Sequence, residues 1–234
     1  MKLEGSSVKK LPVAAAVMAV VAALSGPAMA YQAGDVIVRA GAATVDPDVD
    51  SGKLKANGAV VNPADPTTVD VDSDTQLGLS MTYMLDDKFG IELLAATPFQ
   101  HTIKTKGGLA SLGKLADVKH LPPTLTLQYY PMDSSSAFQP YVGLGLNYTT
   151  FFDEEFKGSN KTAFRGLELK DSWGLAAQLG ADYRIDDNWS VNAAVWYVDI
   201  DTEAKFKSAD GTTKYKVDVE LDPMVYMVGV AYKF

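Results

Sequence analysis

Strict alternation of apolar and polar residues is the feature that most constrains this 234-residue chain. A period of two places successive side chains on opposite faces of an extended strand. Eight runs show it: Val36 to Val45, Thr75 to Met84, Phe89 to Lys104, Val118 to Tyr130, Phe138 to Phe152, Leu169 to Ile185, Trp189 to Asp201 and Tyr215 to Phe234. The last run alternates up to the final residue, Phe234. Such an apolar edge would aggregate unless the last strand closes against the first, so the pattern predicts an all-β, eight-stranded antiparallel barrel.

The connections between the runs alternate in length. Three are short, Leu85 to Lys88, Met132 to Ala137 and Asp186 to Asn188, and four are long, Asp46 to Ser73, Thr105 to Asp117, Asp153 to Glu168 and Thr202 to Lys214. Transmembrane barrels have short periplasmic turns and longer extracellular loops. We therefore expect both termini in the periplasm and the long segments outside the cell.

Aromatic residues near the ends of the runs favour a membrane barrel over a soluble, lipocalin-like one. Near the short turns stand Phe89, Tyr129, Phe138, Tyr183, Trp189, Tyr232 and Phe234, and nearer the long segments stand Phe99, Tyr148, Phe152, Trp173 and Tyr197. Two such groups are typical of the girdles that flank the lipid-facing band. A soluble barrel would bury its larger apolar face instead.

The first thirty residues have the pattern of a cleaved signal peptide. Lysines near the start precede an uncharged run from Leu11 to Leu24, and Ala28-Met29-Ala30 is a small-x-small cleavage motif. The apolar run is shorter than the roughly 20 residues of a spanning helix. We expect cleavage between Ala30 and Tyr31, a barrel domain over residues 31–234, and export to the bacterial outer membrane.

Composition argues against several classes of function. The chain has no cysteine and a net charge of −8, which excludes thiolate chemistry and disfavours nucleic-acid binding. The two histidines, His101 and His120, have no evident nucleophilic partner, and the Asp46-x-Asp48-x-Asp50 motif lacks the later residues of a calcium loop. We therefore expect no catalytic residues, no metal, no cofactor and no enzymatic activity.

Charged residues that face the barrel interior gather near the short-turn end. They are Arg39, Glu92, Asp182, Arg184 and Lys233. An eight-stranded lumen is barely wide enough for its own side chains, so a mixed-sign cluster would plug it. The alternative is a paired polar core without a function in transport.

Above this level the inward positions are apolar or small. Leu94, Trp196, Val198 and Ile200 would form an apolar wall of the lumen, while inward glycines such as Gly78, Gly143 and Gly180 leave space. An apolar wall with room suits a weakly polar solute. Simple core packing is the alternative.

Three prolines interrupt two neighbouring runs. Pro98 lies within the third run, and Pro122 and Pro123 lie within the fourth. Proline cannot donate to a strand ladder, so donors are missing on both sides of this seam and a lateral opening is predicted. The alternative is a harmless strand end.

A series of short motifs resembles the outer membrane protein W family, and its pseudomonad-type members most. They are Val38 to Val45, Asp74 to Leu79, Glu92 to Phe99, His120 to Thr124, Asn147 to Phe152, Lys170 to Gly174 and Trp196 to Thr202. The resemblance implies an eight-stranded barrel that admits small, mostly hydrophobic molecules and releases them sideways into the membrane. It also implies that the positions of Leu94 and Trp196 form a hydrophobic gate.

We therefore expect a passive outer-membrane channel for small hydrophobic molecules. The alternatives are a structural or receptor barrel whose long loops bind partners without transport, and a membrane-embedded enzyme. The expected partners are outer-membrane lipid, the solutes themselves, and the barrel-assembly machinery through Phe234.

Overall fold

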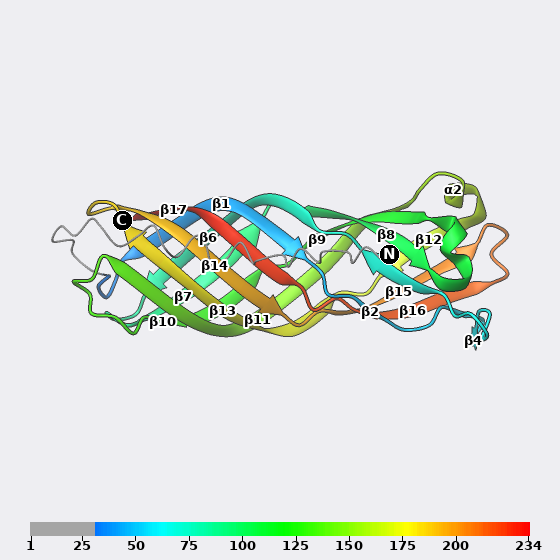
Figure 1. The fold of residues 1–234 in the computed structure, drawn as a ribbon, viewed down its shortest axis with the longest axis horizontal. Helices are drawn as coiled ribbons and strands as arrows, with labels where there is room; N and C mark the ends of the chain where they lie inside the picture. The colour runs from blue at the N-terminus through cyan, green and yellow to red at the C-terminus, as the bar shows by residue number, and fades with distance from the viewer. Residues whose placement is uncertain (1–30) are drawn as a thin grey trace, which may run out of the picture.

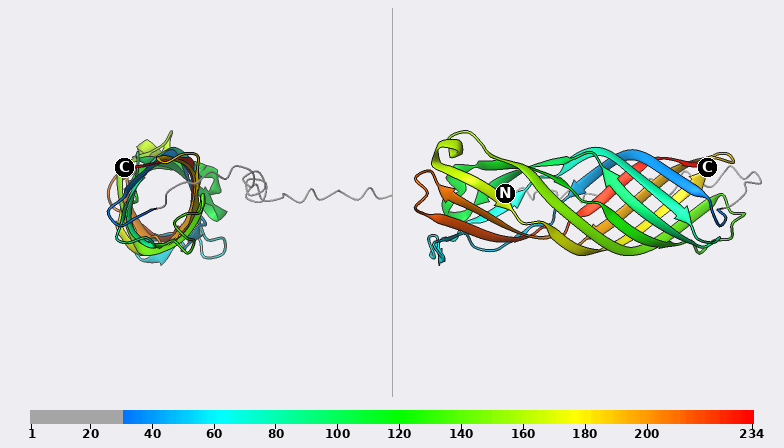
Figure 2. Two further views of the ribbon diagram at one scale, coloured as in Figure 1. Left: turned by 90° about the vertical axis from the view of Figure 1, so that its left-hand side faces the viewer. Right: turned by 180° about the vertical axis from the view of Figure 1, so that it is seen from behind.

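A computed structural model describes residues 31–234, and the proposed signal peptide, including Ala30 of the cleavage motif, lies outside these residues. Eight antiparallel strands close into a barrel, seen end-on in Figure 2. They are β1 (Val36–Asp46), β6 (Asp74–Met84), β7 (Phe89–Ala96), β10 (Thr124–Tyr129), β11 (Phe138–Phe156), β13 (Ser172–Arg184), β14 (Trp189–Val198) and β17 (Met224–Lys233). The ladder closes because β1 pairs with both β6 and β17, and β10 pairs with both β7 and β11.

The apolar face of each strand points outward. Leu77, Leu79 and Met81 of β6 are 50%, 43% and 51% exposed, and Trp173 of β13 is 75% exposed. In a soluble protein such a surface would drive association, whereas in a bilayer it faces lipid. This orientation agrees with the predicted transmembrane barrel.

Neither of the two short helices in residues 31–234 has the length or the apolar run needed to cross a membrane.

Beyond one end of the barrel the strands continue as an extension, at the right of Figure 1. It contains β2 (Asp50–Ser51), β3 (Lys55–Ala56), β4 (Ala59–Val60), β5 (Thr68–Val71), β8 (Phe99–Lys106), the 3₁₀ helix η1 (Gly107–Leu112), β9 (Lys114–Leu121), helix α2 (Asn160–Ala163), β12 (Phe164–Leu169), β15 (Asp201–Ser208) and β16 (Lys214–Glu220). The other end, which carries Tyr31, Phe234 and the short connections, is called the turn end.

The extension corrects two sequence predictions. The four long segments were expected as loops, but about half of their residues form strands, which pair with one another or with the part of β11 that extends beyond the barrel. In addition, the third, fourth and eighth runs are each broken, at Pro98, at Pro122-Pro123 and at Pro223, and the seventh ends at Val198. The prolines remove ladder donors there, so each run becomes a barrel strand and an extension strand.

The aromatic girdles are present with one exception. Phe89, Phe138 and Trp189 are exposed near the turn end, and Trp173 and Tyr197 are exposed near the extension. Phe99, expected in the outer girdle, is 1% exposed and packs inside. Its position was misjudged because the break at Pro98 resets the alternation of β8 relative to β7.

Candidate functional site: the barrel interior

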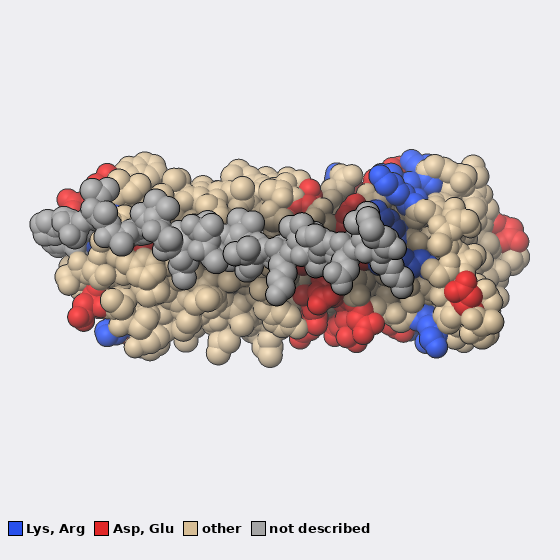
Figure 3. Space-filling model, in the orientation of Figure 1, with Lys and Arg blue, Asp and Glu red and all other residues tan. Residues whose placement is uncertain are grey.

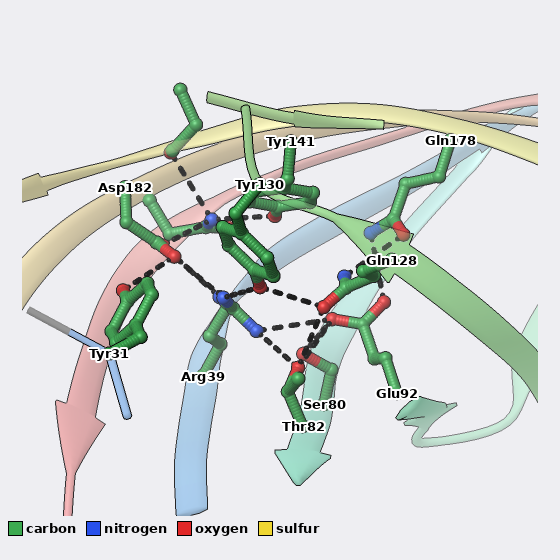
Figure 4. A network of polar contacts seen from close by, with 12 residues as sticks. Tyr31, Arg39, Ser80, Thr82, Glu92, Gln128, Tyr130, Tyr141, Gln178 and Asp182 are labelled. Carbon is green, nitrogen blue, oxygen red and sulfur yellow. Dashed lines mark hydrogen bonds and ion pairs between the residues drawn. The ribbon is translucent and has the colours of Figure 1, made fainter. Parts of the chain in front are cut away.

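The first part of the site is a buried ionic network near the turn end (Figure 4). The Arg39 guanidinium lies 2.6 Å from Asp182 Oδ2 and 3.2 Å from Glu92 Oε2, and all three side chains are at most 1% exposed. Arg39 comes from β1, Glu92 from β7 and Asp182 from β13, so the network ties strands across the lumen. We call Arg39, Glu92 and Asp182 the plug.

Polar neighbours complete the hydrogen bonds of the plug. Arg39 also donates to Thr82 Oγ1 and the Tyr130 hydroxyl, while Ser80 and Gln178 donate to Glu92. With its bonds to the two carboxylates, Arg39 uses all five N–H donors. A buried charge cluster is tolerated only when its groups are paired in this way.

The plug differs in membership from the predicted cluster. Arg184 donates instead to the backbone oxygens of Ser134 and Ser136 in a short connection. Lys233 lies 3.7 Å from Asp35 at the rim of the turn end. Both residues therefore lie outside the plug, because their strands end at this rim.

Sequence reasoning missed three tyrosines in this layer. Tyr31 donates to Asp182 at 2.8 Å and packs edge-on against Tyr130, which in turn packs against Tyr141. The inward glycines do not leave open space, since a Cβ would lie 2.4 Å from the Tyr141 ring at Gly180, 2.5 Å from the Thr126 side chain at Gly143 and 2.7 Å from the Ala43 side chain at Gly78. Alternation along the strands could have identified Gln128 and Thr82 as inward. Tyr31 precedes the first strand, so alternation could not indicate which way its side chain points.

The second part is an apolar constriction above the plug. Leu94 and Trp196, predicted as the gate, both line one small cavity of about 20 Å³ together with Val198 and Ile200. All four are at most 6% exposed. This volume holds about one water molecule, so the constriction is closed to a larger solute in this conformation. The indole N–H of Trp196 is buried without a hydrogen-bond partner in residues 31–234, so it is an unpaired donor in a mostly apolar lining.

The third part is the interrupted seam beside this cavity. Pairing between β7 and β10 ends at Leu94 with Thr124, and pairing between β8 and β9 begins at Phe99 with His120. Pro98, Pro122 and Pro123 lie in the interval, which the ladder does not bridge. Ala95, which is exposed on the lipid face, borders the same small cavity as Leu94.

Asn147 stabilises this seam. Its side-chain amide lies 3.2 Å from the Pro122 oxygen and 2.9 Å from Thr124 Oγ1, and the backbone N–H of Tyr148 donates to the Pro123 oxygen. The carbonyl oxygens of Pro122 and Pro123 thus have partners on β11, although no pairing with β7 or β8 bridges the interval on their other side. An unpaired buried carbonyl would otherwise cost free energy.

The fourth part, which the sequence did not foresee, is an apolar cavity of about 350 Å³ inside the extension. Its wall is almost entirely apolar and includes Ile103, Leu115, Phe206 and Val219. Ile200 and His120 line both this cavity and the small one, so the two adjoin. The segments that form it were expected to be loops and therefore gave no expectation of an enclosed space.

Two histidines lie near the junction of the cavities: both line the large cavity, and His120 also lines the small one. His101 Nδ1 lies 2.5 Å from the Asp72 carbonyl, which can only accept, and His101 Nε2 lies 3.0 Å from His120 Nε2. His101 therefore donates through Nδ1 and accepts from His120 through Nε2. Burial lowers the pKa of both rings, that of His120 to about 3, so both are neutral at pH 7.

These features define an outer-membrane β-barrel whose axial path is filled and whose apolar interior adjoins a break in the wall. Comparison with known proteins identifies the family: the chain belongs to the OmpW family, whose model matches residues 32–234. It is 50% identical to outer membrane protein W of Vibrio cholerae, over 93% of this chain and 97% of the relative. The crystal structure of OprG from Pseudomonas aeruginosa is 55% identical and superposes with a TM-score of 0.83, over 88% of this chain and 99% of OprG.

Two more distant relatives are also similar to this chain. Outer membrane protein AlkL of Ectopseudomonas oleovorans is 26% identical over 87% of this chain and 84% of the relative. The dibenzothiophene metabolism operon protein PahQ of Pseudomonas aeruginosa is 24% identical over 71% of this chain and 75% of the relative.

Proposed function

We propose that this protein is an outer-membrane channel that takes up small hydrophobic molecules and releases them sideways into the membrane. The observation that carries the proposal is the continuity of three features: the 350 Å³ apolar cavity, the Leu94–Trp196 constriction and the interrupted seam. For a solute in the cavity, the plug fills the path along the barrel axis. Toward lipid, the solute meets only the small apolar constriction. The extension is outside the cell in this proposal, since barrels of this class keep their short turns in the periplasm.

The chemistry of the walls favours apolar solutes. A solute with a tight hydration shell would lose it in the cavity without compensating hydrogen bonds, whereas an apolar solute gains from burial. The name of PahQ refers to dibenzothiophene, an aromatic compound with little polarity, and is consistent with this class of solute. The polar plug then keeps water and ions from crossing along the axis.

Uptake by reconstituted vesicles tests the proposal. Purified protein in liposomes should accelerate entry of a small apolar fluorophore above the rate of protein-free liposomes, while sugar-driven swelling stays at the protein-free rate. Equal fluorophore entry in both preparations would contradict a channel and favour a structural or receptor barrel.

We also infer that the C-terminal strand is read by the barrel-assembly machinery. Phe234 is 71% exposed and stacks edge-on against Tyr232, which packs against Trp189 on the neighbouring strand. A terminal aromatic presented on the lipid face is accessible to such a partner before insertion. Deletion of Phe234 should slow insertion in cells, measured as accumulation of unfolded protein in the periplasm.

A further inference from the structure

The outer face of the β15–β16 hairpin is ordered in charged rows. Moving away from the barrel, the directly opposed pairs are Asp201 with Glu220, Glu203 with Asp218, Lys205 with Lys216, and Lys207 with Lys214. Two acidic rows are thus followed by two basic rows, while the alternate residues of the hairpin point into the apolar cavity. Figure 3 shows the same order on the face that it presents, with acidic side chains next to the uncharged barrel and cations beyond them.

The basic rows continue onto the neighbouring strands. Arg165 of β12 lies opposite Lys207, and Lys55 of β3 lies opposite Lys216. A groove of about 660 Å³ follows these rows, lined by six cationic residues and one acidic residue, Glu168, or five net positive charges. We call the six cations the basic groove: Lys55, Arg165, Lys205, Lys207, Lys214 and Lys216.

Three of these cations lack a direct ion pair in the described part of the chain, although the charge of Arg165 acts on Asp210 in the turn of the hairpin. Glu203 pairs with Lys205 and Lys216, and Asp218 lies 3.3 Å from Lys216 and 3.9 Å from Lys55. Within residues 31–234, Arg165, Lys207 and Lys214 form no ion pair with a carboxylate. Like charges directly opposite on antiparallel strands are destabilising, so this row is better suited to an anionic partner than to a free surface.

We propose that the basic groove binds phosphate groups on the core saccharide of lipopolysaccharide in the surrounding outer leaflet. The proposal rests on the extracellular orientation of the extension. Lys205 is eight residues beyond Tyr197 of the outer girdle, which is roughly 20 Å along the barrel axis at about 3.4 Å per residue and a tilt near 40°. That height is above the bilayer surface, in the saccharide layer.

The acidic rows decide between the two sources of phosphate in this lipid. Asp201 and Glu220, which form no ion pair within residues 31–234, lie between the girdle and the groove, at the height of the lipid A phosphates, and repel them. Core phosphates lie farther from the bilayer and reach Arg165, Lys207 and Lys214. Arginine and lysine bind phosphate through charge-assisted hydrogen bonds, which suits an oligosaccharide with several phosphates.

The test measures binding of purified full-length protein in nanodiscs to lipopolysaccharides that differ only in core phosphorylation, and to lipid A alone. The variant Arg165→Gln/Lys207→Gln/Lys214→Gln should bind the phosphorylated core about tenfold more weakly, since three charge contacts are lost. The matched control is Lys104→Gln/Lys106→Gln/Lys119→Gln. These three lysines already form ion pairs, with Asp72 just after β5, Asp70 of β5 and Asp153 of β11, respectively. Its affinity should change less than twofold, and both variants should retain the heat-modifiable gel mobility of the folded barrel.

Three results would overturn the proposal: unchanged binding of the groove variant, equal losses in both variants, or equal wild-type affinity for phosphorylated core, unphosphorylated core and lipid A. Uptake of the apolar fluorophore is independent of the groove. A failure of uptake with intact core-phosphate dependence would therefore refute the channel alone, and normal uptake without that dependence would refute only the groove.

Discussion

Arg39 shows how single residues set the properties of the lumen. Its five N–H groups are all bonded, and its two carboxylate partners are at most 1% exposed. The network lies in the narrow lumen where a buried charge without a partner would be costly. The side chains of the plug therefore both stabilise the barrel and fill the lumen along its axis.

Replacing Arg39 by Met should lower the free energy of unfolding by about 3–5 kcal/mol, because Glu92 and Asp182 would remain buried without a cation. Urea unfolding in detergent micelles measures the change. The control is Arg184→Met, whose guanidinium contacts backbone oxygens at the rim, and its loss should be smaller. Equal losses would show that the plug contributes no special stability.

Leu94 and Trp196 control the size of the constriction. Replacing both by Ala should enlarge the 20 Å³ cavity, admit bulkier apolar fluorophores and cost about 2–5 kcal/mol of stability for each side chain. Ion conductance in planar bilayers should stay low, because the plug lies farther along the axis. The control Leu144→Ala removes a lipid-facing residue that is 73% exposed. If the selectivity for probe size does not change, Leu94 and Trp196 are ordinary packed core residues and not a gate.

At the scale of elements, the two broken strand pairs β7/β8 and β9/β10 matter most. Their prolines remove donors from both sides of one seam, and Asn147 supplies hydrogen bonds to the carbonyls left there. The seam is therefore stable yet weakly bridged. A barrel wall whose strand pairs were all hydrogen-bonded along their full length would have no weakly bridged seam.

Pro98→Ala should restore a donor at the seam and let the strands pair farther. Uptake of the apolar fluorophore should fall several-fold while folding, followed by gel mobility, stays normal. Pro140→Ala is the matched control, since Pro140 lies in β11 within a paired region away from the seam. If uptake by the Pro98 variant equals that of the control, the proline only ends the ladder.

The β8–β9 pair should lose stability in acid. Burial holds the pKa of His120 at about 3, below its ordinary value near 6.5, so the folded extension binds fewer protons than the unfolded one. Its stability is fully present above pH 6.5 and falls by about 1.4 kcal/mol per pH unit toward pH 3 for each proton involved. Hydrogen exchange of β8 and β9 amides between pH 7 and pH 4, corrected for intrinsic rates, measures this loss. His120→Phe should flatten the dependence, and an unchanged slope would refute the assignment to His120.

At the scale of the whole molecule, the barrel and extension form one elongated body with different surfaces (Figures 1 and 3). The barrel presents an apolar band between two aromatic girdles, whereas the extension carries most of the charge outside and an apolar cavity inside. This division matches a body that is half in lipid and half in a polar layer.

Labelling of single cysteines tests the orientation, because the chain has no cysteine of its own. A membrane-impermeant maleimide should label Ser159→Cys and Asp210→Cys in the extension on intact cells. It should label Asp86→Cys, Ser135→Cys and Asp187→Cys at the turn end only after the outer membrane is opened. The reverse pattern would place the extension in the periplasm.

The sequence alone determined the barrel. Alternation with period two is set by backbone geometry, so the inward and outward faces of all eight barrel strands, including Leu94, Trp196, Arg39 and Glu92, could be assigned correctly. The seam prolines could also be located, because a missing N–H is a property of the residue itself.

Only the tertiary structure determined what the inward residues contact. Side chains such as Tyr31, Gly180 and Tyr141 meet across the lumen through a register that no local pattern specifies. The extension strands were missed because they are short and carry charged residues on their outer faces, a pattern that also predicts solvent-exposed loops. Their apolar cavity and the basic groove exist only because strands distant in sequence, such as β3, β12 and β15–β16, pair into one sheet, and long-range pairing is decided by the packing of the whole chain.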